Sequence, residues 1–339
     1  MSVLPVGKLR AQLLQAVFDR HPVKDPRVIV GPRVGEDAAV IDLGDRYLVA
    51  TSDPITFAAA DLAWYALQVN ANDVAVRGAR PQWFLATVLL PEGRTSDASV
   101  AALFDALADA CAELEVTLVG GHTEVTHGLD RPIIAGTMLG EVDKDRLVTT
   151  AGARVGDAVV MTKGIPLEGA AIIGREREAE LLAAGVSAAV VARAKAFVRR
   201  PGLSVLPEAQ LACELAEVHA MHDPTEGGLA TALSELAAVA GVGLRIDRER
   251  IVVLPEGDRL CRAFDLDPLG TLASGALVLT LSPADAAIVI HALARERIDA
   301  HYIGQVVAPE RGVVLVEAGR ERPLPVFPQD EITKLFPGG

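Results

Sequence analysis

Aromatic residues are scarce in this sequence: Phe, Trp and Tyr make up only 4% of its 339 residues. The interior must therefore be built from Ala, Val, Leu and Ile, which are common in sheets covered by helices. Half of the residues are hydrophobic, so the chain can form a packed core and is not intrinsically disordered. A chain of this length favours two domains with separate cores over one large domain.

Cysteine is almost absent as well. The three cysteines, Cys111, Cys213 and Cys261, lie far apart and form no CxxC or Cys/His pattern. This spacing excludes a disulfide framework and a zinc site, and it predicts three buried thiols in a reducing compartment.

Long apolar runs and an excess of basic residues are also missing. No uninterrupted apolar run approaches the roughly 20 residues that cross a bilayer, and the N-terminus has no apolar signal core. We therefore expect a cytoplasmic protein without a membrane partner. There are 45 acidic and 32 basic residues, and the net charge is −13. A chain of this charge is not expected to bind nucleic acid, which requires a basic face.

Strand-like and helical patterns are mixed in both halves of the chain. The class is therefore α/β or α+β, with domains at 1–150 and 151–339, and the Pro-rich tail from about 323 is expected to be loosely ordered. Helices are expected at 5–20, 61–76, 97–115, 167–174, 186–198, 204–217, 226–240 and 283–297. Strands are expected at 38–43, 47–53, 83–90, 116–120, 133–142, 158–163, 242–247, 276–282, 301–307 and 312–318.

Acidic residues recur in the first half where glycines or strand ends expose them. Asp37 follows Gly35 in GPRVGEDAAV, Asp53 ends a strand in TSDPITF, and Asn72-Asp73 interrupt an apolar helix in NANDVAVRG. The first could be a plain turn and the second an Asx turn. A carboxylate inside an apolar helix must either point to solvent or be paired.

A further polar group follows the strand at 116–120. The segment GGHTEVT places His122 and Thr123 directly after two glycines. Taken together, these clusters indicate a magnesium–phosphate site, because Mg²⁺ prefers carboxylate and phosphate oxygens and glycines let backbone N–H groups approach phosphates. There is no GxxxxGK[ST] or GxGxxG motif, so a nucleotide would have to bind through scattered carboxylates.

The second half contains HDPTEGGLATALSELA. Thr225, Gly227 and Gly228 introduce a strong helix, whose N-terminus could bind an anion or could simply be a capped helix start. His222 and Asp223 stand just before it and could act together as a general base.

Six motifs occur in the kind and order seen in the AIR synthase (PurM-like) superfamily, which the chain therefore resembles: GEDAAV, TSDPITF, NANDVAVRGARP, GGHTEV, GDAVVMTKG and DPTEGGLATAL. The resemblance covers residues 30 to 307. NDVAV-x-GA-x-P, the DPT-x-GG-LATAL block, and DPLG followed by IGQVV are most similar to its HypE-like, AIR synthase-related branch. Selenophosphate synthetase and thiamine-monophosphate kinase are relatives.

The resemblance implies two α/β domains and a homodimer whose first halves pair as a β-barrel, with ATP bound beside it. By motif, Asp37, Asp53 and Asp73 would hold Mg²⁺ and the phosphates, and Asn72 would contact phosphate. From the second domain, residues Asp223 and Thr225 would close the site. Imidazole is a poor Mg²⁺ ligand. His122 would therefore lie outside the metal shell and contact phosphate or polarise a water, or it would be satisfied by a carbonyl in a turn.

The chain departs from the family at several positions. HypE carries a terminal cysteine, whereas no cysteine follows Cys261 here. Selenophosphate synthetase needs a reactive Cys or selenocysteine near the N-terminus, whereas no cysteine precedes Cys111 in this chain. HypE has an acidic residue at the position of His122 and commonly an Arg at that of Glu226.

Three hypotheses follow. The first is an enzyme that uses Mg·ATP to phosphorylate or activate an atom of a small molecule or a partner-protein group. The second is a HypE-like nucleotide-binding scaffold without turnover. The third is a small-metabolite kinase of the thiamine-phosphate-kinase type.

Overall fold

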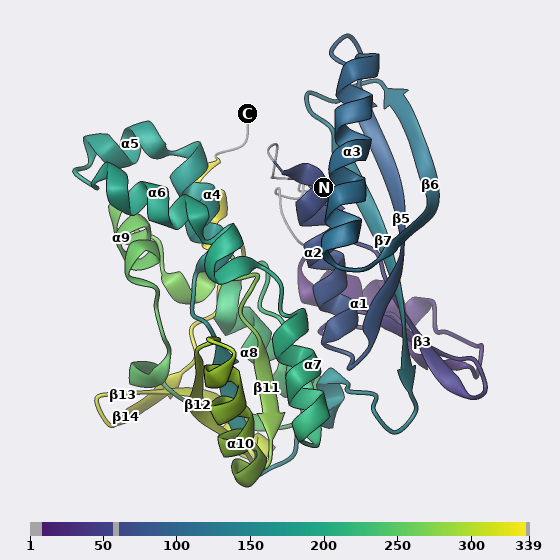
Figure 1. Ribbon diagram of the computed structural model, residues 1–339. Coiled ribbons are helices and arrows are strands. Elements are labelled where there is room, and N and C mark those ends of the chain that lie inside the picture. The colour runs from purple at the N-terminus through teal and green to yellow at the C-terminus, as the bar shows by residue number, and fades with distance from the viewer. Residues whose placement is uncertain (1–8, 57–60, 337–339) are drawn as a thin grey trace. The chain divides into compact units, whose positions relative to one another are not determined.

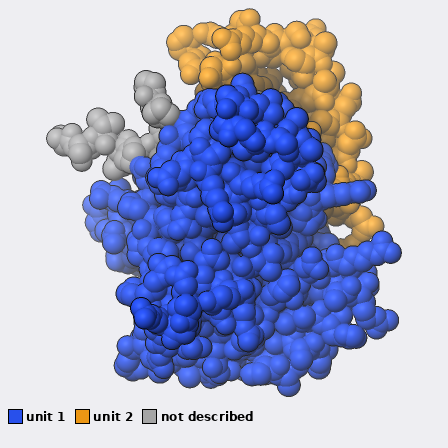
Figure 2. All heavy atoms as spheres, turned by 90° about the vertical axis from the view of Figure 1, so that its left-hand side faces the viewer, with its two compact units in different colours: residues 1–22, 32–36, 148–339 blue, residues 23–31, 37–147 orange. Residues whose placement is uncertain are grey.

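The computed structural model describes residues 9–56 and 61–336. It divides into two units, coloured separately in Figure 2. Unit 2 comprises residues 23–31 and 37–147, and unit 1 comprises residues 1–22, 32–36 and 148–339. The chain passes from unit 2 to unit 1 at 147/148, and the expected domains 1–150 and 151–339 stay a prediction. However, the first helix and the segment 32–36 group with the second half of the chain rather than with the first.

Unit 2 is built on one mixed sheet (Figure 1). Its strands are β1 (Val28–Val30), β2 (Ala39–Asp42), β3 (Arg46–Thr51), β4 (Pro54–Ile55), β5 (Arg80–Pro91), β6 (Thr117–Thr126) and β7 (Ile133–Asp143). They are ordered β1-β2-β3-β7-β5-β6, with β4 paired to β7. All pairs are antiparallel except β5 with β6, whose parallel pairing requires the crossover helix between them.

Two helices accompany this sheet, α2 (Leu62–Ala75) and α3 (Asp97–Glu113). In α2, every residue except Val69 is buried, because the helix is apolar on nearly all sides. The helix α3 begins with a capping box in which Ser96 and Ser99 satisfy each other's backbone N–H groups. The buried polar residues of α2 are therefore enclosed within unit 2.

Unit 1 has a second mixed sheet. Its strands are β8 (Ala158–Thr162), β9 (Val218–His222), β10 (Gly243–Asp247), β11 (Val278–Leu281), β12 (Ala300–Val307), β13 (Val313–Glu317) and β14 (Arg320–Pro323), in the order β14-β13-β10-β12-β8-β11-β9. The strands β8 and β11 are buried throughout. Leu229, Leu233 and Leu236 of the helix α8 (Gly228–Ala240) pack into the same hydrophobic core as these strands.

The helices of unit 1 are α1 (Ala11–Arg20), α4 (Leu167–Glu176), α5 (Glu178–Ala183), α6 (Ala188–Ala196), α7 (Leu206–Leu215), α8 (Gly228–Ala240), α9 (Pro255–Ala263) and α10 (Pro283–Arg295). Shorter helical turns lie at Thr150–Gly152, Val198–Gly202, Arg248–Arg250, Pro268–Gly270, Pro309–Arg311 and Glu331–Leu335. The helix expected at 5–20 is described only from residue 9, and its first four residues lie outside the described part. No helix among the described residues is long and apolar enough to cross a membrane.

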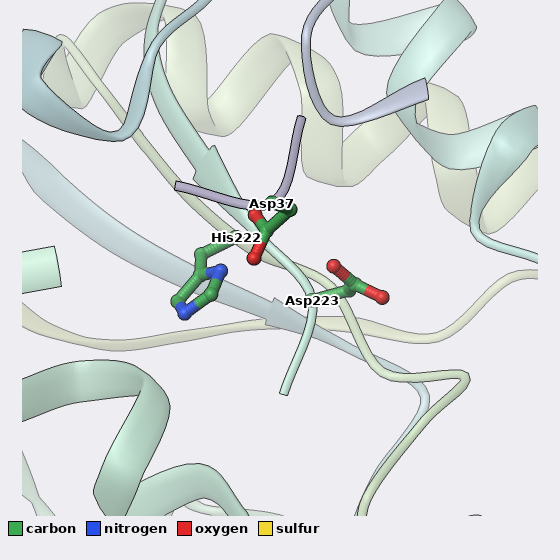
Figure 3. Close-up of side chains that lie close together, drawn as sticks. All are labelled: Asp37, His222 and Asp223. Atoms are coloured by element: carbon green, nitrogen blue, oxygen red, sulfur yellow. The ribbon is translucent and has the colours of Figure 1, made fainter. Parts of the chain in front are cut away.

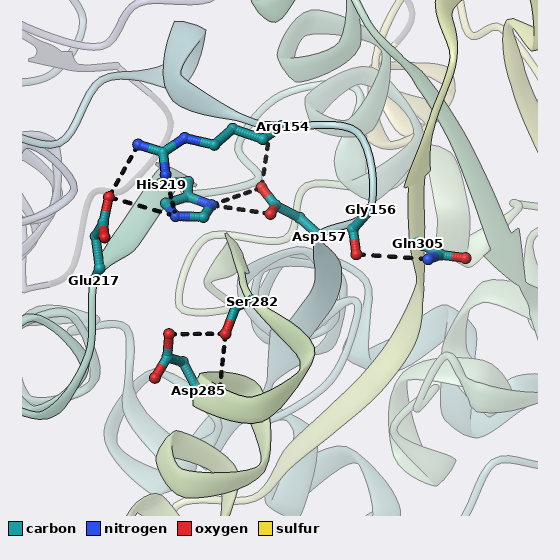
Figure 4. Close-up of polar contacts among 8 residues, drawn as sticks. All are labelled: Arg154, Gly156, Asp157, Glu217, His219, Ser282, Asp285 and Gln305. Atoms are coloured by element: carbon teal, nitrogen blue, oxygen red, sulfur yellow. Dashed lines mark hydrogen bonds and ion pairs between the residues drawn. The ribbon is translucent and has the colours of Figure 1, made fainter.

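Polar contacts among Arg154, Asp157 and His219 join the beginnings of β8 and β9 (Figure 4). His219 Nδ1 lies 2.9 Å from each carboxylate oxygen of Asp157, and the Arg154 guanidinium donates to His219 Nε2 at 2.8 Å. Because a guanidinium can only donate, Nε2 is the acceptor of this bond. His219 thus acts as a structural connector between the two strands.

The segment after Pro323 is packed rather than loose. Leu324, Asp330 and Ile332 are all buried, and Phe327 packs against the core of unit 1. The sequence analysis expected loose order from the prolines, but apolar residues between them anchor the segment.

Candidate functional site

Three elements of unit 2 carry the acidic residues that the sequence singles out. Asp37 precedes β2, Asp53 lies between β3 and β4, and Asp73 lies in the last turn of α2. Figure 3 shows the side chain of Asp37, and it also shows His222 and Asp223 of unit 1, which are treated below within their own unit.

Thr51, the last residue of β3, connects two of these acids. Its hydroxyl donates to Asp73 Oδ2 at 2.7 Å and lies 3.1 Å from the main-chain oxygen of Asp37. Asp73 is 4% exposed, so the choice between a solvated and a paired carboxylate falls on the paired one. The sequence reasoning missed Thr51, because nothing in its local pattern shows that β3 ends beside α2.

Arg77 provides the counter-charge. Its guanidinium donates to Asp37 Oδ2 at 2.7 Å, and the arginine side chain is completely buried while that of Asp37 is 16% exposed. A guanidinium stays protonated at any physiological pH, so this contact is a charge-assisted hydrogen bond between Arg77 and the Asp37 carboxylate. The two residues are 40 positions apart in the chain, so the sequence reasoning missed this pair as well.

Asn70 fixes the main chain at Asp53. The backbone N–H of Asp53 donates to Asn70 Oδ1 at 2.9 Å, and Asn70 Nδ2 donates to the Asp53 carbonyl at 3.2 Å. This two-way bond joins the β3–β4 connection to α2. Asn72, the neighbour predicted to contact phosphate, is completely buried in the same helix.

The donor set fits magnesium chemically, since it consists of carboxylate, hydroxyl and amide oxygens. Within the described part of unit 2, however, Asp37, Asp53 and Asp73 do not bring their carboxylate oxygens within 4.8 Å of one another as a group. A cation there would therefore need further oxygens, which Mg²⁺ usually takes from water and from substrate phosphates.

His122 lies on a strand and not in a turn. The strand expected at 116–120 continues through both glycines, so β6 runs to Thr126. The His122 side chain is 66% exposed, and its Nε2 lies 3.3 Å from Glu124 Oε2. Thr123 is exposed on the same strand. The structure thus differs from the turn alternative, because β6 keeps its pairing with β5 along this stretch.

In unit 1, His222 ends β9 and Asp223 follows it, a strand that the sequence analysis did not predict. Both are buried, at 2% and 1% exposure. His222 Nε2 lies 3.1 Å from Glu235 Oε2, a carboxylate on α8. The end of β9 therefore holds two buried titratable groups a few residues before α8 begins.

Gly35, Gly227 and Gly228 all have a positive φ angle, a backbone conformation that favours glycine. Gly227 is the N-cap of α8 with φ +81°, and a Cβ there would lie 2.2 Å from Thr231 Oγ1. The Gly228 N–H donates to the Thr225 carbonyl at 3.0 Å. Gly35 has φ +82°, and a Cβ there would lie 2.6 Å from Val239 Cγ2 of α8. The N-cap of α8 is therefore a glycine, and Thr225 lies two residues before it.

Two of the three cysteines are poor nucleophiles. Burial raises the pKa of the Cys261 thiol to about 12 and also raises that of Cys111. Because the thiolate is the reactive form, neither is suited to attack a substrate at neutral pH.

Comparison with known proteins identifies the family. The model of the AIR synthase related protein N-terminal domain matches residues 35–142, and that of the C-terminal domain matches residues 154–317. The carbamoyl dehydratase HypE of Cupriavidus necator is 31% identical over 91% of this chain and 86% of its own length.

Solved structures show the same fold. The crystal structure of the hydrogenase maturation protein HypE in complex with ATP is 26% identical, with a TM-score of 0.71 and coverage of 95% of each chain. The structure of a HypE–HypF complex has a TM-score of 0.75 at 22% identity, covering 94% of this chain and 100% of that one. The predicted two-domain PurM-like fold is confirmed. This chain belongs to the AIR synthase-related protein family, in the branch that includes HypE.

Proposed function

We propose that this protein binds Mg·ATP and uses it to phosphorylate or activate an oxygen, sulfur or nitrogen atom of a small molecule or of a group on a partner protein. The observation that carries the proposal is the buried connection of Asp37, Thr51 and Asp73 in unit 2, with Arg77 beside it. Burying so many charged and polar groups together is costly, and such groups are more common at functional sites than in a purely structural core.

Asp37, Asp53 and Asp73 are the residues that would hold the magnesium ion. When bound, the ion would supply charge neutralisation on the phosphate oxygens, which is the main requirement of phosphoryl transfer. In this proposal Arg77 orients the Asp37 carboxylate and Asn70 holds the main chain at Asp53 in place. The side chain of Asn72, the Gly35 backbone and Thr123 are proposed phosphate contacts, as the family resemblance implies.

Asp223 and Thr225 of unit 1 are proposed to complete the site, with Asp223 accepting a proton or orienting the substrate. The glycines Gly227 and Gly228 are proposed to keep this loop close to the ligand. His122, exposed on β6, is proposed to contact phosphate or to polarise a water. The ATP complex of HypE, at 26% identity, supports a nucleotide as the ligand class.

A homodimer through unit 2 is part of the proposal. The strand β6 ends its sheet and pairs only with β5 among the described strands. Its ten residues are largely exposed, including Val119 at 51% and Val125 at 56%. A long exposed edge strand is a template for pairing with another chain. We expect Val125→Lys to shift the protein from dimer to monomer in size-exclusion chromatography with light scattering.

The test is a calorimetric titration of ATP into the purified full-length protein, with and without Mg²⁺. We expect binding that depends on Mg²⁺ and that Asp73→Asn removes, because the substitution keeps the shape but deletes the charge. The matched control is Asp109→Asn, which makes the same change at an exposed position of α3 in the same unit.

Either result is decisive for the proposal. Absence of ATP binding under all conditions would refute it. If Mg·ATP binds, the rate of ATP hydrolysis with candidate substrates separates an enzyme from a nucleotide-binding scaffold. A phosphorylated product would then identify a kinase.

A further inference from the structure

Helix α8 cannot cap its own N-terminus. The N-cap residue, Gly227, has no side chain, and its φ of +81° together with the closeness of Thr231 leaves room for no other residue. The first N–H groups of a helix need an acceptor, which Ser, Thr, Asn or Asp at the N-cap usually supplies. In this chain the acceptor must come from elsewhere.

Asp330, more than a hundred residues further along the chain, accepts the N–H of this N-cap residue. The Gly227 N–H donates to Asp330 Oδ2 at 2.7 Å, and the Ile332 N–H donates to Asp330 Oδ1 at 2.9 Å. Leu272 donates a third backbone N–H to this carboxylate. Asp330 is 7% exposed, so the carboxylate is enclosed at the start of α8.

The surrounding segment, residues 324–336, is fastened at several further points, and we call it the C-terminal strap. Glu331 accepts the backbone N–H of Asp267 at 3.0 Å, and the Phe327 ring covers Gly270, so both contacts hold the Asp267–Gly270 loop. At its end, the strap carbonyl of Leu335 and the ring of Phe336 both contact the Arg177 guanidinium.

The two loops held by the strap also touch each other. A Cβ on Gly228 would lie 2.5 Å from the Leu269 carbonyl oxygen, so the Asp267–Gly270 loop lies directly against the start of α8. The Gly228 N–H in turn closes the turn that begins at Thr225. The strap therefore fixes the end of the segment 223–228 from outside that segment.

We propose that Asp330 is a positioning residue: from a distant part of the same chain it accepts the N–H of the N-cap residue of α8 and holds the loop 223–228 in the conformation that Asp223 and Thr225 need, which makes the C-terminal strap a working part of the site. The consequence for nucleotide binding rests on the proposed function, whereas the capping of α8 does not.

The charge at this position supports the assignment. Burial raises the pKa of Asp330 to about 6, and the nearby Glu226 carboxylate acts in the same direction, while its three backbone donors lower it. The buried Glu168 also lies near enough for Asp330 to raise its pKa. At neutral pH the Asp330 carboxylate is therefore mostly ionised, which is the form that the positive end of a helix favours.

The test compares Asp330→Asn with Glu331→Gln in the full-length protein. The two residues are neighbours on the strap, both are buried, and both accept a backbone N–H, but only Asp330 contacts α8. Amide hydrogen exchange at residues 227–229 is the first readout. We expect Asp330→Asn to speed it roughly tenfold, the scale of a lost hydrogen bond to a charged group, and Glu331→Gln to leave it unchanged.

The affinity for Mg·ATP is the second readout, and we expect Asp330→Asn to weaken it while Glu331→Gln does not. A merely structural role would raise exchange throughout unit 1 and would do so alike in both variants. Unchanged exchange at 227–229 in Asp330→Asn would overturn the proposal. So would faster exchange there with unchanged Mg·ATP affinity.

The test also separates this inference from the proposed function. If the unsubstituted protein fails to bind Mg·ATP, the proposed function falls, but the exchange comparison still decides whether Asp330 caps α8. Should Asp330→Asn fail to fold, Asp330→Ser provides a second route, because its shorter side chain can still accept the Ile332 N–H but does not reach the Gly227 N–H. Faster exchange at 227–229 in that variant would support the proposal, and unchanged exchange would oppose it.

Discussion

The hydroxyl of Thr51 donates to the buried Asp73 carboxylate at 2.7 Å, joining the end of β3 to the last turn of α2. Replacing Thr51 by Val keeps the shape but removes this donor. Because a buried acceptor that loses a partner costs about 1–3 kcal/mol, we expect Thr51→Val to destabilise the protein by that amount. Thr51→Ser retains the hydroxyl and serves as the control. Urea denaturation measures both, and equal stability of the two variants would contradict the expectation.

The Arg77–Asp37 ion pair is the next target. The Arg77 side chain is completely buried, and its guanidinium donates to Asp37 Oδ2. Breaking a buried pair on one side costs about 3–5 kcal/mol, and we expect Asp37→Asn to approach the lower part of this range because its carboxylate is partly exposed. A double-mutant cycle with Arg77→Met measures the coupling. Strict additivity of the two substitutions would show that the pair contributes nothing to the free energy of unfolding.

Lys163 and Glu208 form a second buried ion pair, in unit 1. Lys163 Nζ lies 2.6 Å from Glu208 Oε1, and it also donates to the carbonyls of Gly202 and Gly275. Lys163→Met leaves the buried carboxylate without its counter-charge, so we expect a loss of about 3–5 kcal/mol in the free energy of unfolding. Adding Glu208→Gln should recover part of that loss. A double variant less stable than Lys163→Met would refute this explanation.

Glu168 should give the protein a measurable pH dependence. Burial is the main reason that its pKa rises from 4.5 to about 7, with the Ser274 hydrogen bond opposing the rise. Between these two values the folded state binds the proton more tightly than the unfolded state, so stability falls as the pH rises through this window. Asp330, with a pKa of about 6, adds to the same slope.

We therefore expect Glu168→Gln to be more stable than the unsubstituted protein at pH 8, by an amount on the order of 1–3 kcal/mol, and to lose this advantage towards pH 4.5. Thermal unfolding across this pH range measures the difference. Glu214→Gln, at an exposed position on α7, is the control, and we expect it to leave the stability unchanged at every pH. A constant difference between Glu168→Gln and the unsubstituted protein at every pH would show that ionisation of Glu168 is not the cause.

Several elements could be predicted because their signal is local. The apolar run of α2, the capped amphipathic α3 and the apolar strand β8 each carry a pattern that one stretch of sequence reveals. The strand β9 was missed, because it is short and its two histidines conceal the apolar alternation. The extension of β6 past Gly120-Gly121 was missed for another reason. A glycine pair usually ends a strand, but β5 continues to pair with this one.

The acidic residues of the candidate site were also visible in the sequence, because a carboxylate inside an apolar helix is unusual and the other acidic residues recur at glycines and strand ends. Their partners were not. Thr51, Asn70 and Arg77 are ordinary residues of a strand end and a helix until the sheet of unit 2 brings β3 against α2.

The sequence by itself determined the mixed class, the family and the set of candidate carboxylates, because each depends on residue types at short spacings. Only the tertiary structure decided which of them are paired and with what. Gly227 and Asp330 show the reason. A helix start that needs an acceptor is a local property, but the acceptor that satisfies it can come from any part of the chain that folding brings within hydrogen-bond distance.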